Sequence, residues 1–202
     1  TVFFGSQLFR LGNAVIGVEI CEDLWVPLPP SSHLVLTGAN LILNLSASNE
    51  LVAKNAYRRE LIAGQSGRCI CGYVYASAGV GESTTDLVFS GACTVAENGS
   101  ILAESERFSR TGSRAVACID VAKLSAERRK NGSFHDNAVD FSEGIPTVTG
   151  VLPHLELCRM DRSYDPTPFI PGDQRTREER CKEIFAIQAA GLAKRLSHTG
   201  LK

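Results

Sequence analysis

The chain has 202 residues, of which 44% are hydrophobic and 21% are charged, as in globular proteins with a packed core. Its net charge of −1 gives no reason to expect nucleic acid or an anionic membrane as a partner. No apolar run reaches the roughly 20 residues that cross a bilayer, and we see no signal peptide. Seven cysteines, an odd number, argue against a disulfide framework and favour a cytoplasmic protein.

Residues 1–130 alternate short apolar runs with helical segments. Strands are expected over 13–20, 41–45 and 69–77, with a short helix from Ser31 to Gly38 and a longer one over about 50–65. Two more strands flank Asn98-Gly99, because both residues of this dipeptide tolerate the positive φ of a tight hairpin turn. A further strand is expected over 115–121. This order predicts an α/β sheet covered by helices on at least one face.

The character of the sequence changes after residue 130. Residues 131–172 are rich in Pro, Gly, Asp and Ser and predict an extended linker. Thr176 and Glu179 form a plausible capping box for a helix that runs to about residue 197, with one apolar face. We therefore divide the chain into an α/β domain (1–130), a linker (131–172) and a C-terminal helix (173–202) that leads into a further domain.

Cys21 stands where a buried strand ends and a turn begins. Layered α/β proteins place reactive groups at such positions, and a sharp turn there exposes the side chain and aims backbone N–H groups at a developing oxyanion. Taken alone, this position favours a packing role, since most buried cysteines are structural. The same packing interpretation is given to Cys69, Cys71, Cys93 and Cys118. No His or Cys spacing predicts a zinc site.

The surroundings of Cys21 change this interpretation. The run Gly17-Val-Glu-Ile-Cys-Glu-Asp-Leu-Trp25 resembles the nucleophile motif of the nitrilase superfamily. It is followed by Asn44-Leu-Ser-Ala-Ser48, by Lys54 and by the Arg58-Arg59 pair. With Gly81-Glu-Ser-Thr-Thr-Asp-Leu87 further on, these motifs are similar in order to the glutaminase domain of bacterial glutamine-dependent NAD synthetases. The resemblance implies that residues 1–130 are the C-terminal half of a nitrilase-like glutaminase domain, and so part of a four-layered α-β-β-α sandwich.

The resemblance also implies a mechanism. Cys21 would attack the side-chain amide carbon of glutamine, ammonia would leave, and water would hydrolyse the thioester. The backbone N–H of Glu22 would donate to the oxyanion. Ser48 would bind the α-substituents of glutamine, Lys54 would pair with its α-carboxylate, and Trp25 would wall the pocket. The plainer alternatives are a helix N-cap for Ser48, a solvated helix face for Lys54 and a core aromatic for Trp25.

One departure from the family limits these expectations. The family's catalytic Glu and Lys belong to segments before the nucleophile strand, whereas residues 1–20 carry only Arg10 and Glu19 as charges. The isolated chain is therefore expected to lack the base and the oxyanion lysine. It holds no cofactor site of its own, and ATP and Mg²⁺ are expected in the absent synthetase domain. We expect a homo-oligomer, because half of a layered sheet exposes apolar surface. The alternatives are a silent half-domain with an assembly or regulatory role and a free-standing nitrilase-like amidase.

Overall fold

The computed structural model describes residues 5–139, 141, 144–151, 162–164, 166–167, 169–170 and 172–200. The chain divides into two compact units, residues 1–157 and 158–202, and each is described by itself. The first unit is built on a seven-stranded sheet with the order β6-β5-β4-β3-β2-β1-β7. Its strands are β1 (Leu8–Leu11), β2 (Ala14–Ile20), β3 (Leu41–Ser46), β4 (Gly72–Ser77), β5 (Cys93–Glu97), β6 (Ser100–Glu104) and β7 (Thr147–Gly150).

The centre of the sheet is parallel and its flanks are mixed. Strands β2, β3 and β4 run parallel to one another. Strand β1 is antiparallel to β2, β5 is antiparallel to β4, and β6 is antiparallel to β5. Parallel strands share one direction, so the carboxyl ends of β2 and β3 lie at one edge of the sheet and the amino end of β4 lies at the opposite edge.

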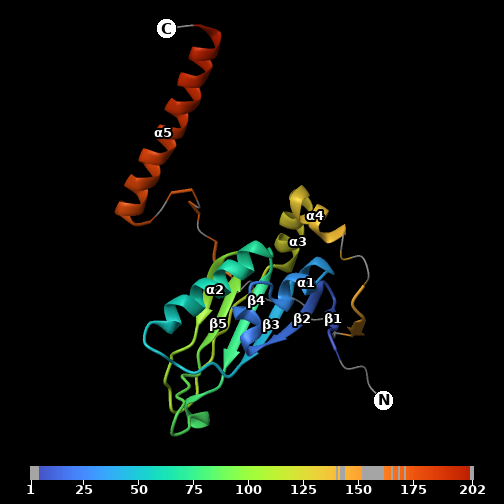
Figure 1. The fold of residues 1–202 in the computed structure, drawn as a ribbon. Helices are drawn as coiled ribbons and strands as arrows, with labels where there is room; N and C mark the ends of the chain where they lie inside the picture. Colours follow the sequence, from blue (N-terminus) through green and yellow to red (C-terminus); the bar gives the residue numbers. More distant parts are fainter. Residues whose placement is uncertain are drawn as a thin grey trace. The chain divides into compact units, whose positions relative to one another are not determined.

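Among the described residues, helices cover one face of the sheet and leave apolar side chains on the other face partly exposed. Helices α1 (Pro30–Leu36) and α2 (Lys54–Arg68) cover the first face (Figure 1). The core there joins residues from both helices and the strands, among them Leu34, Ile42, Ile62 and Tyr73. On the opposite side of the pleat lie partly exposed apolar side chains: Val18, Ile20 and Leu45 are 37%, 64% and 57% exposed. The fold thus supplies one sheet and one helical layer, consistent with part of a nitrilase-like α/β sandwich.

Strands β2 and β3 and the hairpin were predicted correctly, but the helix boundaries and the start of β4 were not. Asn98 and Gly99 have φ of 45° and 87° and join β5 to β6 as expected. Helix α2 begins at Lys54, four residues later than predicted, because Ala53 takes a left-handed φ of 67°. It also continues through Gly67, where the sequence suggested an end. The N-cap of α1 is Pro29 rather than Ser31.

Two predictions for the later part of the first unit were wrong. Residues 115–120 form no strand, and helix α3 (Val121–Lys130) starts where that strand was to end; Cys118 is exposed rather than packed in a core. The segment 131–172 contains α4 (Gly132–Val139) and β7, so 131–150 is not an extended linker. Strand β7 forms because the free edge of β1 offers backbone partners. The predicted domain boundaries themselves stay a prediction.

The second unit contains α5 (Gln174–Thr199). Its N-cap is Asp173, whose Oδ1 accepts a hydrogen bond from the Thr176 backbone N–H at 2.8 Å. The predicted capping box of Thr176 with Glu179 is therefore wrong, and Glu179 pairs instead with Arg175 at 3.1 Å. Within the described residues, no helix is both long enough and apolar enough to span a bilayer.

Candidate active site

Cys21 occupies a strained turn at the carboxyl end of β2. Its φ is 52°, in the left-handed region that costs a residue with a Cβ about 1–2 kcal/mol. A short 3₁₀ helix over Cys21–Trp25 follows at once. The backbone N–H of Ile20 donates to Asp23 Oδ2 at 2.7 Å and so ties the last strand residue to the turn. The turn leaves the Cys21 side chain half-buried rather than enclosed.

The structure brings all five predicted site residues to one hollow of about 330 Å³. These residues share the carboxyl edge of the sheet, and with Asn49 they form most of the lining: Cys21, Glu22, Trp25, Ser48, Lys54 and Asn49. The arrangement follows from the parallel sheet, since β2 ends at Ile20 beside Leu45 of β3, and the chain then continues into the loop that carries Ser48. A small polar molecule that enters this hollow therefore meets a thiol, a hydroxyl and an ammonium group.

Lys54 is held by its neighbours rather than free on a helix face. Its Nζ donates to the backbone oxygen of Asn49 and to Asn49 Oδ1, each at 2.9 Å. It also lies 5.2 Å from the centre of the Trp25 ring, and that ring packs at 5.6 Å against Tyr57. An ammonium group has three donors, so one remains for an anionic ligand. Trp25 both lines the hollow and packs against the core.

Ser48 and Glu22 contribute to the hollow in different ways. Ser48 is buried, and its backbone N–H donates to Ser77 Oγ at 3.4 Å. It is not the N-cap of α2, because that position belongs to Ala53. The exposed Glu22 follows Cys21 directly and also lines the hollow. The structure therefore removes the simplest non-functional explanation for Ser48.

A buried ion pair joins the loop between Ser48 and Lys54 to helix α2. Glu50 Oε1 lies 2.6 Å from Arg58 Nη2, with the two side chains 8% and 1% exposed. Ser90 donates to the same carboxylate oxygen at 2.5 Å, and Arg107 lies 3.4 Å from the other. Burial opposes ionisation, but these hydrogen bonds and charges hold the pKa of Glu50 below its ordinary value. Sequence reasoning missed this cluster, although the Arg58-Arg59 pair signalled it.

A second buried carboxylate stands behind the nucleophile turn. Glu19 is 2% exposed and accepts hydrogen bonds from the Ser31 backbone N–H at 2.8 Å, from Asn44 Nδ2 at 3.4 Å and from the Tyr73 hydroxyl. Burial, together with the Glu19 charge, raises the pKa of Tyr73 well above its ordinary value. The sequence showed Glu19 only as an isolated charge, because its partners come from α1, β3 and β4.

The groups that line the hollow limit what it can bind. Among the described residues, no group of three or more His, Cys, Asp or Glu side chains could hold a metal ion. The hollow carries one thiol at its edge beside a polar, half-open space. This donor set suits nucleophilic attack on an uncharged carbonyl carbon, with the ammonium group placed to receive an acidic part of the same molecule.

Comparison with known proteins agrees with this geometry. The carbon-nitrogen hydrolase family model matches residues 1–131, well over half of the chain. The chain therefore belongs to the carbon-nitrogen hydrolase family. A carbon-nitrogen hydrolase from Helicobacter pylori has a similar fold, with a TM-score of 0.54 and 18% identity; the match covers 70% of this chain and 52% of that one.

Relatives of higher identity are longer proteins. The chain is 40% identical over 203 aligned positions to the glutamine-dependent NAD(+) synthetase of Mycobacterium tuberculosis, covering 96% of this chain and 30% of that protein. It is 40% identical over 201 positions to the enzyme of the same name from Mycobacterium leprae, with the same shares. The chain thus spans about 30% of the length of these relatives.

Proposed function

We propose that the chain carries the nucleophile half of a glutaminase site that supplies ammonia for the ATP-dependent conversion of deamido-NAD to NAD. The observation that carries this proposal is the half-exposed Cys21 in a left-handed turn at the edge of a hollow that also holds Ser48 and Lys54. The names of the relatives and the family membership support glutamine as the substrate.

Each lining residue has a role in the proposed reaction. The Cys21 thiolate attacks the amide carbon, and the backbone N–H of Glu22 donates to the oxygen that becomes negative. Ammonia leaves, and water then hydrolyses the glutamyl thioester. The remaining donor of Lys54 binds the α-carboxylate, Ser48 binds the α-substituents, and Trp25 limits the width of the hollow. The Asn49 contacts fix the Lys54 ammonium before substrate arrives.

The rest of the machinery is proposed to lie outside these 202 residues. The relatives are more than three times as long, and the open face that carries Val18, Ile20 and Leu45 is suited to a second sheet. That additional part would supply the general base, the oxyanion lysine and the synthetase domain with its ATP and Mg²⁺. We further propose a cytoplasmic homo-oligomer.

The test is glutamate release from glutamine by the full-length protein. Cys21→Ser should lower this rate by at least about 10³-fold while the far-ultraviolet spectrum stays unchanged. The matched control is Cys93→Ser, which also removes a half-buried thiol but lies in β5, and it should keep the parent rate. A glutamine-like diazoketone should attach to Cys21. An intact fold with neither hydrolysis nor labelling would favour a silent module instead.

Substitution of Lys54 tests glutamine binding separately from the reactivity of the Cys21 thiol. Lys54→Met should raise the KM for glutamine by about 10–100-fold, since a charge-assisted hydrogen bond to the substrate is lost. Reaction of Cys21 with iodoacetamide, which has no carboxylate, should be unchanged. If alkylation slows as much as hydrolysis, Lys54 acts on the turn rather than on the substrate, and its proposed role is wrong.

A further inference from the structure

A second pair of thiols lies at the opposite edge of the sheet from Cys21. Cys69 is the C-cap of α2, and Cys71 directly precedes β4. The amino end of β4 lies at the opposite edge of the sheet from the carboxyl ends of β2 and β3. Neither thiol takes part in the site proposed for glutamine. Both are buried, with exposed fractions of 5% and 0%.

The turn between the two cysteines is a helix-ending motif with an unusual residue in it. The Cys71 backbone N–H donates to the Ser66 oxygen at 3.0 Å, and the Ile70 N–H donates to the Gly67 oxygen at 3.2 Å, which is the Schellman pattern. Its left-handed position is normally Gly, but here it is Ile70 with φ of 46°. The reversal at Ile70 turns the chain so that both thiols lie inside the same core.

The two sulfur atoms have unequal surroundings. Gln65 Nε2 donates to Cys69 Sγ at 3.3 Å. The neighbouring Cys71 side chain and the charges of Arg68 and Arg128 hold the pKa of Cys69 below its ordinary value despite burial. The neighbouring Cys69 side chain, together with burial, raises the pKa of Cys71 well above its ordinary value. The Cys69 thiol is therefore easier to ionise than the Cys71 thiol.

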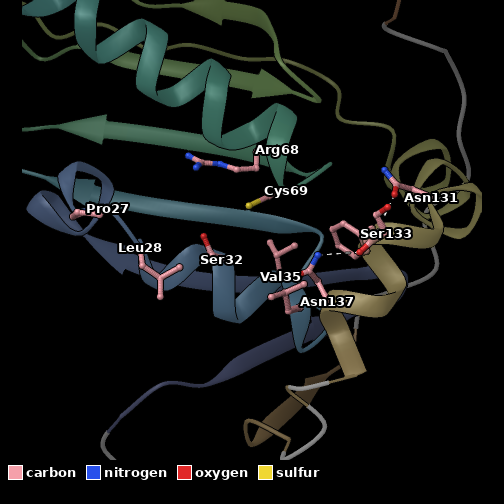
Figure 2. A pocket seen from close by; sticks show the side chains of 11 residues that line it. Pro27, Leu28, Ser32, Val35, Arg68, Cys69, Asn131, Ser133 and Asn137 are labelled. Carbon is pink, nitrogen blue, oxygen red and sulfur yellow. Dashed lines mark hydrogen bonds between the residues drawn. The ribbon is translucent and has the colours of Figure 1, made fainter.

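A cavity gives small molecules access to Cys69. It measures about 400 Å³ and lies between α1, the end of α2 and α4. Figure 2 shows the sulfur of Cys69 at the wall of this cavity, near Arg68 and Ser32. Cys71 does not line it. A reagent arriving through the cavity thus meets Cys69 first, and Cys71 lies behind it.

We propose that Cys69 and Cys71 form a peroxide-reactive dithiol site, separate from the Cys21 site, that closes to a disulfide. The Cys69 thiolate attacks one oxygen of hydrogen peroxide, and the O–O bond breaks. Hydroxide departs, and Cys69 becomes a sulfenic acid. The Cys71 thiol then attacks that sulfur, the S–S bond forms, and the S–O bond breaks. The hydroxyl group leaves as water with the Cys71 proton, so two thiols reduce one peroxide.

The test uses the full chain in a Cys21→Ala background, so that oxidation at the proposed catalytic thiol cannot interfere. After peroxide treatment of the folded protein, free thiols are blocked with N-ethylmaleimide in denaturant. Cleavage after Arg68 and after Glu82 isolates Cys69 with Cys71, and cleavage after Glu97 places Cys93 on a neighbouring peptide as an internal control. The first peptide should become an unblocked disulfide at least about 10-fold faster than Cys93 is oxidised, and dithiothreitol should reverse this.

Single variants distinguish the attacking from the resolving thiol. Cys71→Ser should leave a sulfenic acid at Cys69 that dimedone captures, whereas Cys69→Ser should leave Cys71 reduced and blocked by maleimide. The proposal is overturned if both thiols stay reduced at peroxide doses that oxidise Cys93. It is also overturned if Cys71 oxidises as fast without Cys69. Circular dichroism of each variant confirms that these outcomes refer to folded protein.

Discussion

The two edges of the parallel strands show how one kind of turn can present a thiol or enclose it. Cys21 and Ile70 both have positive φ, 52° and 46°. At the carboxyl edge, the turn leaves Cys21 half-buried beside a polar hollow. At the amino edge, α3 lies over the turn, and Arg128 donates to the backbone oxygens of Ala39, Cys69 and Ile70 at 2.7–3.1 Å. Backbone strain alone therefore does not make a thiol accessible; what packs over the turn decides it.

The largest expected effect on stability concerns the buried ion pair between Glu50 and Arg58 near the carboxyl edge. Arg58→Met leaves the Glu50 carboxylate without its closest charge partner and should lower the free energy of unfolding by about 3–5 kcal/mol, measured by urea denaturation. The matched control is Arg59→Met, because Arg59 pairs with Glu104 at 2.7 Å on the surface. That exposed pair should contribute less than about 1 kcal/mol. Equal effects of the two variants would contradict the anchoring role of Arg58.

At the amino edge, Arg128→Met should lower the free energy of unfolding by about 2–3 kcal/mol, because three backbone oxygens lose a charged donor. Arg129 is the control, since it precedes Lys130 on the same helix and Arg129→Met removes none of these bonds. Urea denaturation gives the stability, and maleimide labelling of folded protein should show Cys69 more reactive in Arg128→Met. Unchanged labelling would mean that other contacts close this edge.

The Glu50 cluster should also give the carboxyl edge a pH dependence. The pKa of Glu50 is lowered on folding, so its contribution is fully present above the ordinary value of 4.5 and is lost as the pH falls through the lower folded value. The stability difference between the parent protein and Glu50→Gln should therefore shrink as the pH falls from 6 to about 3. Urea midpoints across this range provide the measurement, and a constant difference would contradict it.

The smallest effect concerns the start of α2. Ala53 has φ of 67° and is exposed, so Ala53→Gly relieves left-handed strain without loss of buried surface. Glycine also raises the conformational entropy of the unfolded chain, which offsets part of this effect. We therefore expect the free energy of unfolding to rise by about 0.5–1 kcal/mol. The thermal midpoint should rise slightly. Ala56→Gly, inside α2, should lower it by a similar amount, and the same sign for both would refute the strain argument.

The sequence predicted best the features that depend on local pattern. The strands ending at Ile20 and Ser46 and the Asn98-Gly99 turn follow from apolar runs and turn residues. The grouping of Cys21, Ser48 and Lys54 follows from the parallel order, because consecutive parallel strands end at the same edge. Their roles came from the resemblance alone and stay proposals.

Features that depend on distant partners were not predicted. The left-handed residues Ala53 and Ile70 carry no glycine signal, so the start of α2 and the turn before β4 were misplaced. Strand β7 exists because β1 offers an edge, which no local pattern around residues 147–150 reveals. The Glu19 and Glu50 clusters join side chains from several elements, and such pairings appear only when the elements are assembled.

The Glu19 cluster also bears on the order of folding. Its hydrogen bonds join residues that are 12, 25 and 54 positions apart in the sequence. Closing the longest of these loops requires β4 to have joined the sheet, and contacts between residues far apart in the sequence cost more loop-closure entropy than local ones. A nascent or partly folded chain can therefore hold β2 without the buried support behind Cys21. The support behind the strained turn is therefore complete only when β2, β3 and β4 have paired.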